Sequence, residues 1–393
     1  MSNLTFSSTE PATFLNATLN QTINATTGEP TKAASSTKWI LEYWPALIAN
    51  VFWDINTLPQ WIRWMRFLGT PLIMLTGLVG NTFALILMLD RSMRKHTYAW
   101  YIMTLAVCDT AMIGVRLCSW INMISLATGG GLLIKITDDV GCILSEGIPD
   151  VFQTTGAWMM ATIAAERFTV VWFPFISRRL TPKISAIVIV GMFIFAILST
   201  LYYIIYIRFV EEVQFCAVPY EIGWVTQLYL GFPMEYIPAM IIIVCNGLVV
   251  FSLTRRQRSV KETKKLATKS RNKITFMLML LTFSFLILTL PAWIFEEIYK
   301  KYYGSIPKYV EMPTREIIEF FYQMNYSVNF FIYVISGNEL RALFKQKMGA
   351  CRSALRRNIH ASMQNTSDQS ESNQRSDKTY KTSVPSSGNE ANT

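Results

Sequence analysis

The stretch ISAIVIVGMFIFAILSTLYYIIY, residues 184–206, decides the fold class, because it contains no Asp, Glu, Lys or Arg. A helix needs about 20 mostly apolar residues to cross the hydrocarbon core of a bilayer. Residues 67–89 and 274–294 are equally free of charged side chains. Four further apolar runs carry a few polar groups: residues 98–126, 140–172, 222–253 and 317–336. The sequence therefore predicts an all-α integral membrane protein, a bundle of seven transmembrane helices.

Composition separates this chain from the soluble protein classes. Hydrophobic residues make up 51% of the chain and charged residues 16%, whereas about 25% of a typical soluble domain is charged. The net charge of +10 does not indicate nucleic-acid binding, because the basic residues lie between apolar runs rather than on one folded polar surface. Six cysteines are too few for a disulfide-dense scaffold or a zinc ribbon. We expect membrane lipid as a partner and no nucleic acid.

Basic residues between the runs predict the orientation of the bundle, because cytoplasmic loops carry an excess of Lys and Arg. The excess follows the first, third and fifth runs, at Arg91, Arg94, Lys95, Arg178, Arg179, Lys183 and several positions within residues 255–273. We therefore expect a plasma-membrane protein with an extracellular N-terminus and a cytoplasmic C-terminus. Four glycosylation acceptors of the form Asn-x-Ser/Thr agree with this orientation: Asn3, Asn16, Asn20 and Asn24. The alternative for this leader is a Thr-rich disordered segment without sugar.

The bundle is predicted over residues 67–336, and the segments before and after it differ from it in composition. Residues 1–66 are expected to form a disordered, glycosylated extracellular tail. Residues 337–351 predict a short amphipathic helix in the membrane interface, with apolar and basic residues on opposite faces. Cys351 is a palmitoylation candidate just beyond it, although an unmodified cysteine fits equally well. Residues 352–393 are rich in Ser, Thr, Asn and Gln and predict a disordered cytoplasmic tail.

Ionisable groups inside the runs are costly in a bilayer and suggest functional sites. Asp109 and Arg116 stand seven residues apart and share one helix face. A second stripe on the third run contains Glu146, Asp150 and Gln153, and a stripe on the seventh contains Tyr322, Asn325, Asn329 and Tyr333. We expect these faces to point into the bundle. The alternative is that the polar groups only hydrogen-bond one helix to another.

The spacing of several short motifs resembles that of the rhodopsin-like (class A) G-protein-coupled receptors, from about Phe67 to Cys351. Arg167, within the triplet Glu166-Arg167-Phe168, stands 25 residues after Cys142, and Pro174 follows. The other matching positions are Gly80-Asn81, the segment from Leu105 to Asp109, Pro238, Phe285, Pro291 and the segment from Asn329 to Tyr333. Together, the order and spacing of these motifs predict a cell-surface receptor.

The resemblance implies roles for individual residues. Glu166 would hold the Arg167 guanidinium in a resting pair whose release frees the arginine for a G protein; the alternative is an arginine that snorkels at the interface. Cys142 would pair with Cys216. The residues assigned to activation are Asp109, Glu166, Arg167, Asn246, Asn325, Asn329 and Tyr333. The partners implied are a heterotrimeric G protein and, through the Ser/Thr-rich tail, receptor kinases and arrestin.

Several positions depart from the family's usual residues. Thr289 stands where a Trp is usual, Phe330 where a Pro is usual, and Asn246 where a Tyr is common. Gly156 occupies a position where many relatives have Ser, which weakens the expectation of a sodium ion beside Asp109. The Asn-Phe-x-x-Tyr ending and the Leu-Pro pair of the sixth run look most similar to invertebrate neuropeptide receptors of the FMRFamide type.

The residues expected in the ligand site narrow the ligand class. Amine receptors carry an Asp where this chain has Pro149, and opsins carry a retinal-binding Lys where it has Gln323. The candidate ligand contacts are Arg116, Glu146, Asp150, Gln153, Glu235, Glu296 and Tyr322. Their excess of negative charge favours a cationic ligand. We expect a short basic, amidated neuropeptide whose cation sits between Glu146 and Asp150, unless these acids are satisfied by Arg116 and by one another.

Other functional classes are less consistent with this sequence. A receptor for a non-peptide ligand remains the alternative within the family. A transporter or channel would need charges or broken helices along a path through both leaflets, whereas the sixth run is uncharged and no internal repeat is evident. An enzyme is not expected, because no nucleophile and base, metal-ligand spacing or phosphate loop is present in the pattern. No cofactor is expected.

Overall fold

The computed structural model describes residues 58–127, 136–210, 215–217, 236–257, 265–302, 306–337, 340–350, 352–354 and 356–359. The chain divides into two units, Met1–Phe330 and Phe331–Thr393, and each is described by itself. The expected sites at Asn3, Asn16, Asn20, Asn24, Glu235 and Cys351 lie outside the described residues.

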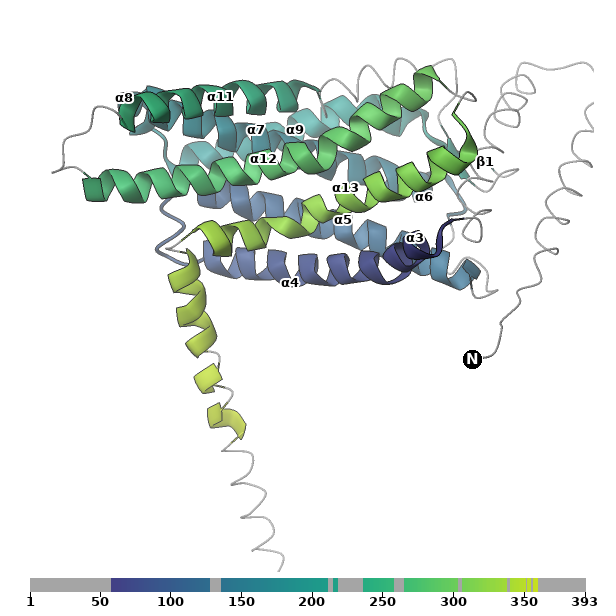
Figure 1. Ribbon diagram of the computed structural model, residues 1–393, viewed down its shortest axis with the longest axis horizontal. Helices are drawn as coiled ribbons and strands as arrows, with labels where there is room; N and C mark the ends of the chain where they lie inside the picture. The colour runs from purple at the N-terminus through teal and green to yellow at the C-terminus, as the bar shows by residue number, and fades with distance from the viewer. Residues whose placement is uncertain are drawn as a thin grey trace, which may run out of the picture. The chain divides into compact units, whose positions relative to one another are not determined.

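Long helices form the first unit and lie side by side (Figure 1). The first span comprises α3 (Gln60–Trp64), the π-helical segment η1 (Met65–Gly69) and α4 (Thr70–Met88), and the second is α5 (Thr97–Ala127). The third comprises α6 (Asp139–Cys142), the π-helical segment η2 (Ile143–Gly147) and α7 (Ile148–Trp172), followed by the short α8 (Pro174–Ser177). The remaining spans are α9 (Pro182–Tyr206), α11 (Ile237–Gln257), α12 (Lys265–Lys301) and α13 (Lys308–Ser336).

Five helical stretches among the described residues are long and apolar enough to cross a membrane: Gln60–Met88, Thr97–Ser125, Pro182–Tyr206, Ile237–Arg255 and Lys273–Tyr299. The two long helices outside this set, α7 and α13, each carry one of the polar stripes predicted from the sequence. Of the run expected over residues 222–253, the described part begins at residue 236.

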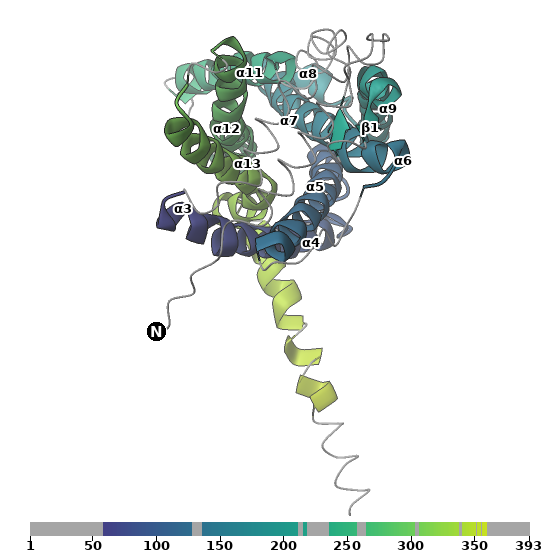
Figure 2. The same ribbon diagram turned by 90° about the vertical axis from the view of Figure 1, so that its right-hand side faces the viewer.

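The third span is the centre of the bundle, since α7 packs against α5, α9, α11 and α12. Figure 2, which views the bundle from its end, shows these helices around α7. Small buried residues on α7, among them Gly156, Ala157, Ala161 and Ala164, allow neighbouring backbones to approach closely. This central place agrees with the position expected for the span that begins near Cys142.

The first and third spans change from π-helix to α-helix where a proline follows. Pro71 and Pro149 each stand in the first turn of an α-helix, directly after η1 and η2. A proline has no N–H to donate, so a helix must rearrange its hydrogen bonds one turn earlier, and a π turn is one such local adjustment. The wider turn also changes which way the side chains before the proline face.

The first and seventh spans approach each other closely. Asn81 donates through Nδ2 to the Tyr326 carbonyl at 3.0 Å, and Ser327 donates to the Ile73 carbonyl at 2.8 Å. A Cβ added to Gly80 would lie 2.9 Å from Cβ of Phe330. Glycine is therefore required at this contact, where α13 crosses α4.

The second unit contains the end of α13 and the residues after it. Residues 340–350 are helical and lie within residues 337–351, for which the sequence predicts an amphipathic helix. Leu340 is buried, and Arg341 donates to the carbonyls of Val334 at 3.1 Å and Ile335 at 2.6 Å. These bonds satisfy backbone acceptors at the end of α13, where the helix has no following turn.

Candidate functional site

One end of the bundle, the disulfide end, is marked by the bond between Cys142 and Cys216. This is the pairing that the resemblance implied. Cys216 lies on β2 (Phe215–Ala217), which pairs antiparallel with β1 (Arg208–Val210) so that it stands opposite Phe209. The Phe209 backbone N–H also donates to Asp139 Oδ1 at 2.7 Å. The hairpin is thus attached to the start of the third span by a covalent bond and a hydrogen bond.

Among the described residues, three ion pairs connect α13 to other spans at this end. Arg66 of η1 pairs with Glu316 at 2.5 Å, Arg116 of α5 pairs with Glu319 at 2.8 Å, and Glu296 of α12 pairs with Arg315 at 3.0 Å. We call these the α13 ion pairs. Arg116 pairs with Glu319, whereas the sequence offered Glu146 and Asp150 as its partners only as the alternative to a ligand contact. The α13 ion pairs also give Glu296, an expected ligand contact, a partner within the protein.

The Arg116–Glu319 pair has a further constraint. Gln323 donates through Nε2 to the same Glu319 oxygen, Oε1, at 3.2 Å. The side chains of Arg116 and Glu319 are 33% and 37% exposed, so the pair is accessible rather than sealed in the core. Two donors from two helices therefore hold one carboxylate in place.

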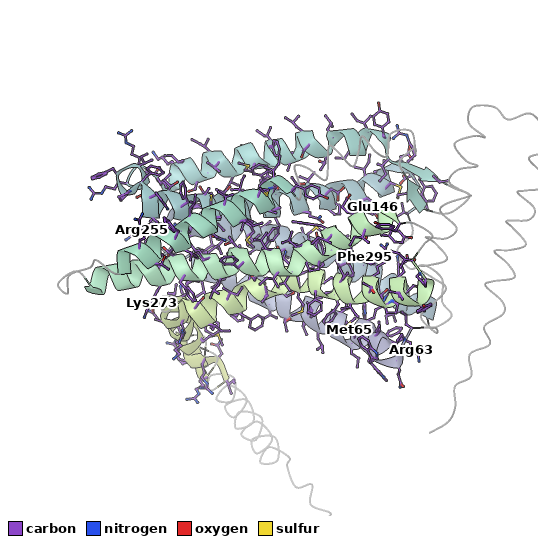
Figure 3. The ribbon with its side chains drawn as sticks, turned by 45° about the horizontal axis from the view of Figure 1, so that its top comes forward. Arg63, Met65, Glu146, Arg255, Lys273 and Phe295 are labelled. Atoms are coloured by element: carbon purple, nitrogen blue, oxygen red, sulfur yellow. A yellow bond between two sulfur atoms is a disulfide. The ribbon has the colours of Figure 1, made fainter. Side chains whose placement is uncertain are left out.

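Glu146 differs from the α-helical stripe that the sequence predicts. It lies in the π-helical segment η2 and is exposed, whereas Asp150 is half-buried on α7. A π turn has more residues than an α turn, so spacing counted on 3.6 residues per turn does not carry from 150 back to 146. Within the described part of the chain no ion pair forms at Glu146, although Arg116 lies within electrostatic reach. Figure 3 shows Glu146 at the same end of the bundle as Phe295, opposite Arg255 and Lys273.

Tyr322, expected as a ligand contact, is buried in the core. It belongs to a cluster with Met74, Met112, Ile113 and Tyr326. Its ring meets that of Tyr326 edge-on, with centroids 5.8 Å apart. Because Tyr322 is 7% exposed, its side chain packs in the core and does not face a ligand in this conformation.

A small cavity lies at the level of Asp109, with a volume of about 20 Å³, which is room for about one water molecule. Asp109 accepts a hydrogen bond from Asn329 Nδ2 at 2.7 Å. Asn325 and Gln153 also line the cavity, together with Gly156 and Trp293. Asn325 Oδ1 and Trp293 Nε1 are buried without a partner among the described residues. The polar stripes predicted on the second, third and seventh runs thus meet here.

The lining of this cavity is a poor fit for a dedicated sodium site. Hard cations prefer cages of oxygen ligands. Gly156 supplies no side-chain oxygen, and Cys108 and Trp293 occupy further parts of the wall. Groups of three or more metal-binding side chains are also absent from the described residues.

The aromatic residue missing at Thr289 has a counterpart one turn later on α12. Thr289 is buried and donates to the Phe285 carbonyl at 2.7 Å. Trp293 is 6% exposed, and its indole meets the Phe285 ring edge-on at 5.9 Å between centroids. Trp293 was not among the site residues predicted from the sequence, although its spacing of four from Thr289 and eight from Phe285 placed all three on one helix face.

Asn246, another departure from the family's pattern, joins two spans. It donates through Nδ2 to Thr282 Oγ1 at 2.9 Å, between α11 and α12. Both side chains are buried. The amide and the hydroxyl thus fix the packing of these helices in this conformation.

At the opposite end, which we call the Arg167 end, Glu166 and Arg167 form a buried ion pair. The Arg167 guanidinium also lies over the Tyr98 ring, 5.6 Å from its centroid. A cavity of about 410 Å³ at this end is lined by both members of the pair and by Lys95, His96, Tyr98 and Ile274. With 6% exposure, Arg167 is not an arginine that snorkels to the interface. Tyr333, the last of the expected activation residues, is 2% exposed.

A seven-helix bundle with a tethered hairpin at one end and a buried acid–arginine pair at the other matches one known class of protein. The sequence model of the family described as 7 transmembrane receptor (rhodopsin family) matches residues 80–333. The chain therefore belongs to this family of multi-pass plasma-membrane receptors, which signal without enzymatic activity. The all-α seven-helix fold predicted from the sequence is confirmed.

Among curated proteins, the chain is similar to the somatostatin receptor type 5 of Bos taurus. The two are 24% identical over 230 residues, which cover 57% of this chain and 60% of the relative's length.

Several residues of the site were not anticipated from the sequence. Glu319 and Glu316, which pair with Arg116 and Arg66, were not proposed as site residues, nor was Arg315. The sequence did contain a signal for the two glutamates. Glu316 and Glu319 stand three residues apart at the start of the seventh run, where a carboxylate must face a partner or water. Which cation each would meet depends on how the helices pack, so the sequence could not assign the pairs.

Proposed function

We propose that this receptor is activated by a short basic, C-terminally amidated neuropeptide and signals through a heterotrimeric G protein. In this proposal the disulfide end faces outward and the Arg167 end faces the cytoplasm. The basic loops and the glycosylation acceptors in the leader favour that orientation. Relatedness to a somatostatin receptor, a peptide receptor, favours a peptide ligand. The Asn-Phe-x-x-Tyr ending and the Leu-Pro pair, which look similar to those of FMRFamide-type receptors, favour an amidated peptide.

The observation that carries the proposal is the charge balance at the disulfide end. Each of the α13 ion pairs is neutral, because an arginine faces a glutamate in each. Glu146 is exposed and forms no ion pair among the described residues, and Asp150 follows it on α7. The carboxylate of Glu146 on the third span therefore attracts a ligand cation, such as an Arg or Lys side chain.

The Arg167 end supports the signalling step. The closed Glu166–Arg167 pair is one of two packings of the bundle, and ligand binding favours the other to the extent that the ligand binds it more tightly. Opening the pair releases the guanidinium into the cavity lined by Lys95 and His96, where a G protein docks. Phosphorylation of the Ser/Thr-rich tail by receptor kinases then creates anionic docking positions for arrestin. Palmitoylation of Cys351 anchors the segment that follows the bundle.

The test is to express the full chain with a promiscuous G protein and to screen neuropeptides for calcium release. We expect responses to basic amidated peptides. Activation by amines alone, or an ionic current without ligand, would contradict the proposal.

For each active peptide, Asp150→Asn is then compared with Asp139→Asn, which removes an exposed carboxylate that pairs at 3.6 Å with Arg208 on the hairpin. Asp150→Asn should lower the potency of basic agonists about tenfold or more, since 1.4 kcal/mol of lost pairing is a factor of ten. Asp139→Asn should change potency little. Equal effects of the two variants would remove the charge-pairing argument.

A further inference from the structure

The Arg116–Glu319 ion pair joins α5 to α13 on the side of Asp109 that faces the disulfide end. Arg116 stands seven residues from Asp109 on α5, which is about 10 Å along the helix axis. The guanidinium is within electrostatic reach of Tyr322, Tyr326 and Glu146. The pair therefore lies near both the buried Tyr322 cluster and the exposed Glu146. Its two side chains are 33% and 37% exposed, so a peptide that reaches this depth between α5 and α13 would meet them.

The charge of this pair is already balanced. Arg116 Nη1 lies 2.8 Å from Glu319 Oε1, and Gln323 adds a second donor to that oxygen. A ligand carboxylate arriving here would have to displace Glu319 from the guanidinium, and it would then lie beside a carboxylate of the same sign. Like charges brought together in a partly desolvated site repel each other strongly.

A carboxamide meets no such penalty. It is neutral and presents two N–H donors and one acceptor oxygen, so it can bond to the outer atoms of the pair without breaking it. The same site therefore favours a C-terminal carboxamide and rejects a free C-terminal carboxylate. Discrimination here comes from repulsion of the wrong ligand.

We propose that the Arg116–Glu319 pair is the specificity determinant that selects peptides with a neutral, amidated C-terminus and rejects those with a free carboxylate. This inference rests on the proposed peptide-receptor function. Glu319 occupies the Arg116 guanidinium, so that it does not bind a ligand carboxylate, and the hydrogen bond from Gln323 holds Glu319 in this position. The α13 pair between Arg66 and Glu316 lies closer to the end of the bundle and does not take part.

The experiment uses the full-length receptor and active peptides from the screen, each synthesised in two forms, with a C-terminal carboxamide and with a free carboxylate. The measured quantity is the ratio of the two potencies in calcium release. Wild-type receptor should prefer the amide. Glu319→Gln frees Arg116, so the ratio should move toward the free acid by about tenfold or more, which corresponds to about 1.4 kcal/mol.

Three further variants make the result specific. Glu316→Gln applies the same chemical change three residues earlier on α13 and should leave the ratio unchanged. Arg116→Gln with Glu319→Gln removes both charges and should not create a preference for the free acid. Arg116→Gln alone leaves Glu319 uncompensated and should strengthen the preference for the amide. This last variant tests the inference from the opposite side if Glu319→Gln fails to reach the cell surface.

The two proposals fail in different ways. A wild-type receptor that responds to no peptide contradicts the proposed function. A receptor that responds, but whose amide-to-acid ratio is the same in wild type, Glu319→Gln and Arg116→Gln, leaves the function intact and overturns the role of the pair. An equal shift in Glu316→Gln would also overturn it, because the effect would then be one of overall charge.

Discussion

The hydrogen bond between Asn246 and Thr282 should hold the receptor in its resting packing. Asn246→Leu removes the amide, and Thr282→Val removes the hydroxyl with little change of shape. Each breaks the 2.9 Å bond between α11 and α12 in the conformation that also contains the closed Glu166–Arg167 pair. We expect either substitution to shift the receptor toward its alternative packing and to raise basal signalling.

The magnitude follows from the setting of this bond. Interhelical hydrogen bonds in membrane proteins average about 0.6 kcal/mol and reach about 1.7. The Asn246–Thr282 bond is at the upper part of that range, because both side chains are buried and neither can turn to water. A loss of 0.6 to 1.7 kcal/mol changes a two-state equilibrium by about 3-fold to 20-fold. Basal activity that is a few per cent of the maximum should therefore rise several-fold.

The assay is ligand-free nucleotide exchange on a G protein in isolated membranes, normalised to receptor number at the cell surface. The double variant, Asn246→Leu with Thr282→Val, is the decisive control, because two partners of one bond should not have additive effects. Its basal activity should be close to that of the stronger single variant. Unchanged basal activity in both single variants, or additive effects in the double variant, would refute the reasoning.

Two other expected outcomes concern the Arg167 end and the contact between α4 and α13. Glu166→Gln should raise basal exchange because it removes the charged partner of the buried Arg167; an unchanged level at equal surface expression would argue against a resting pair. Gly80→Ala should lower surface expression and thermal stability in detergent, since its Cβ would lie 2.9 Å from Phe330, whereas Gly156→Ala should be tolerated, since its nearest neighbour is 3.8 Å away. Similar melting temperatures for these two variants would contradict the packing argument.

The helical periodicity of the sequence anticipated a large part of the interior. Asn325 and Asn329 are buried as the stripe on the seventh run predicted, and Asp109 meets Asn329 directly. These residues lie in regular α-helix, where spacing alone decides which face a side chain occupies. Glu146 was placed less accurately because a π turn, which apolar patterning does not reveal, precedes Pro149.

By itself, the sequence determined the number of spans, the family and the motif positions at both ends of the bundle, because bilayer thickness and helix geometry act on each span locally. Only the tertiary structure decided which charges meet. Arg116 pairs with Glu319 and Glu296 with Arg315, although the sequence offered Glu146 and Asp150 as partners for Arg116. Such pairs depend on the rotation and depth of one helix against another, and these are set by packing along the whole length of both helices.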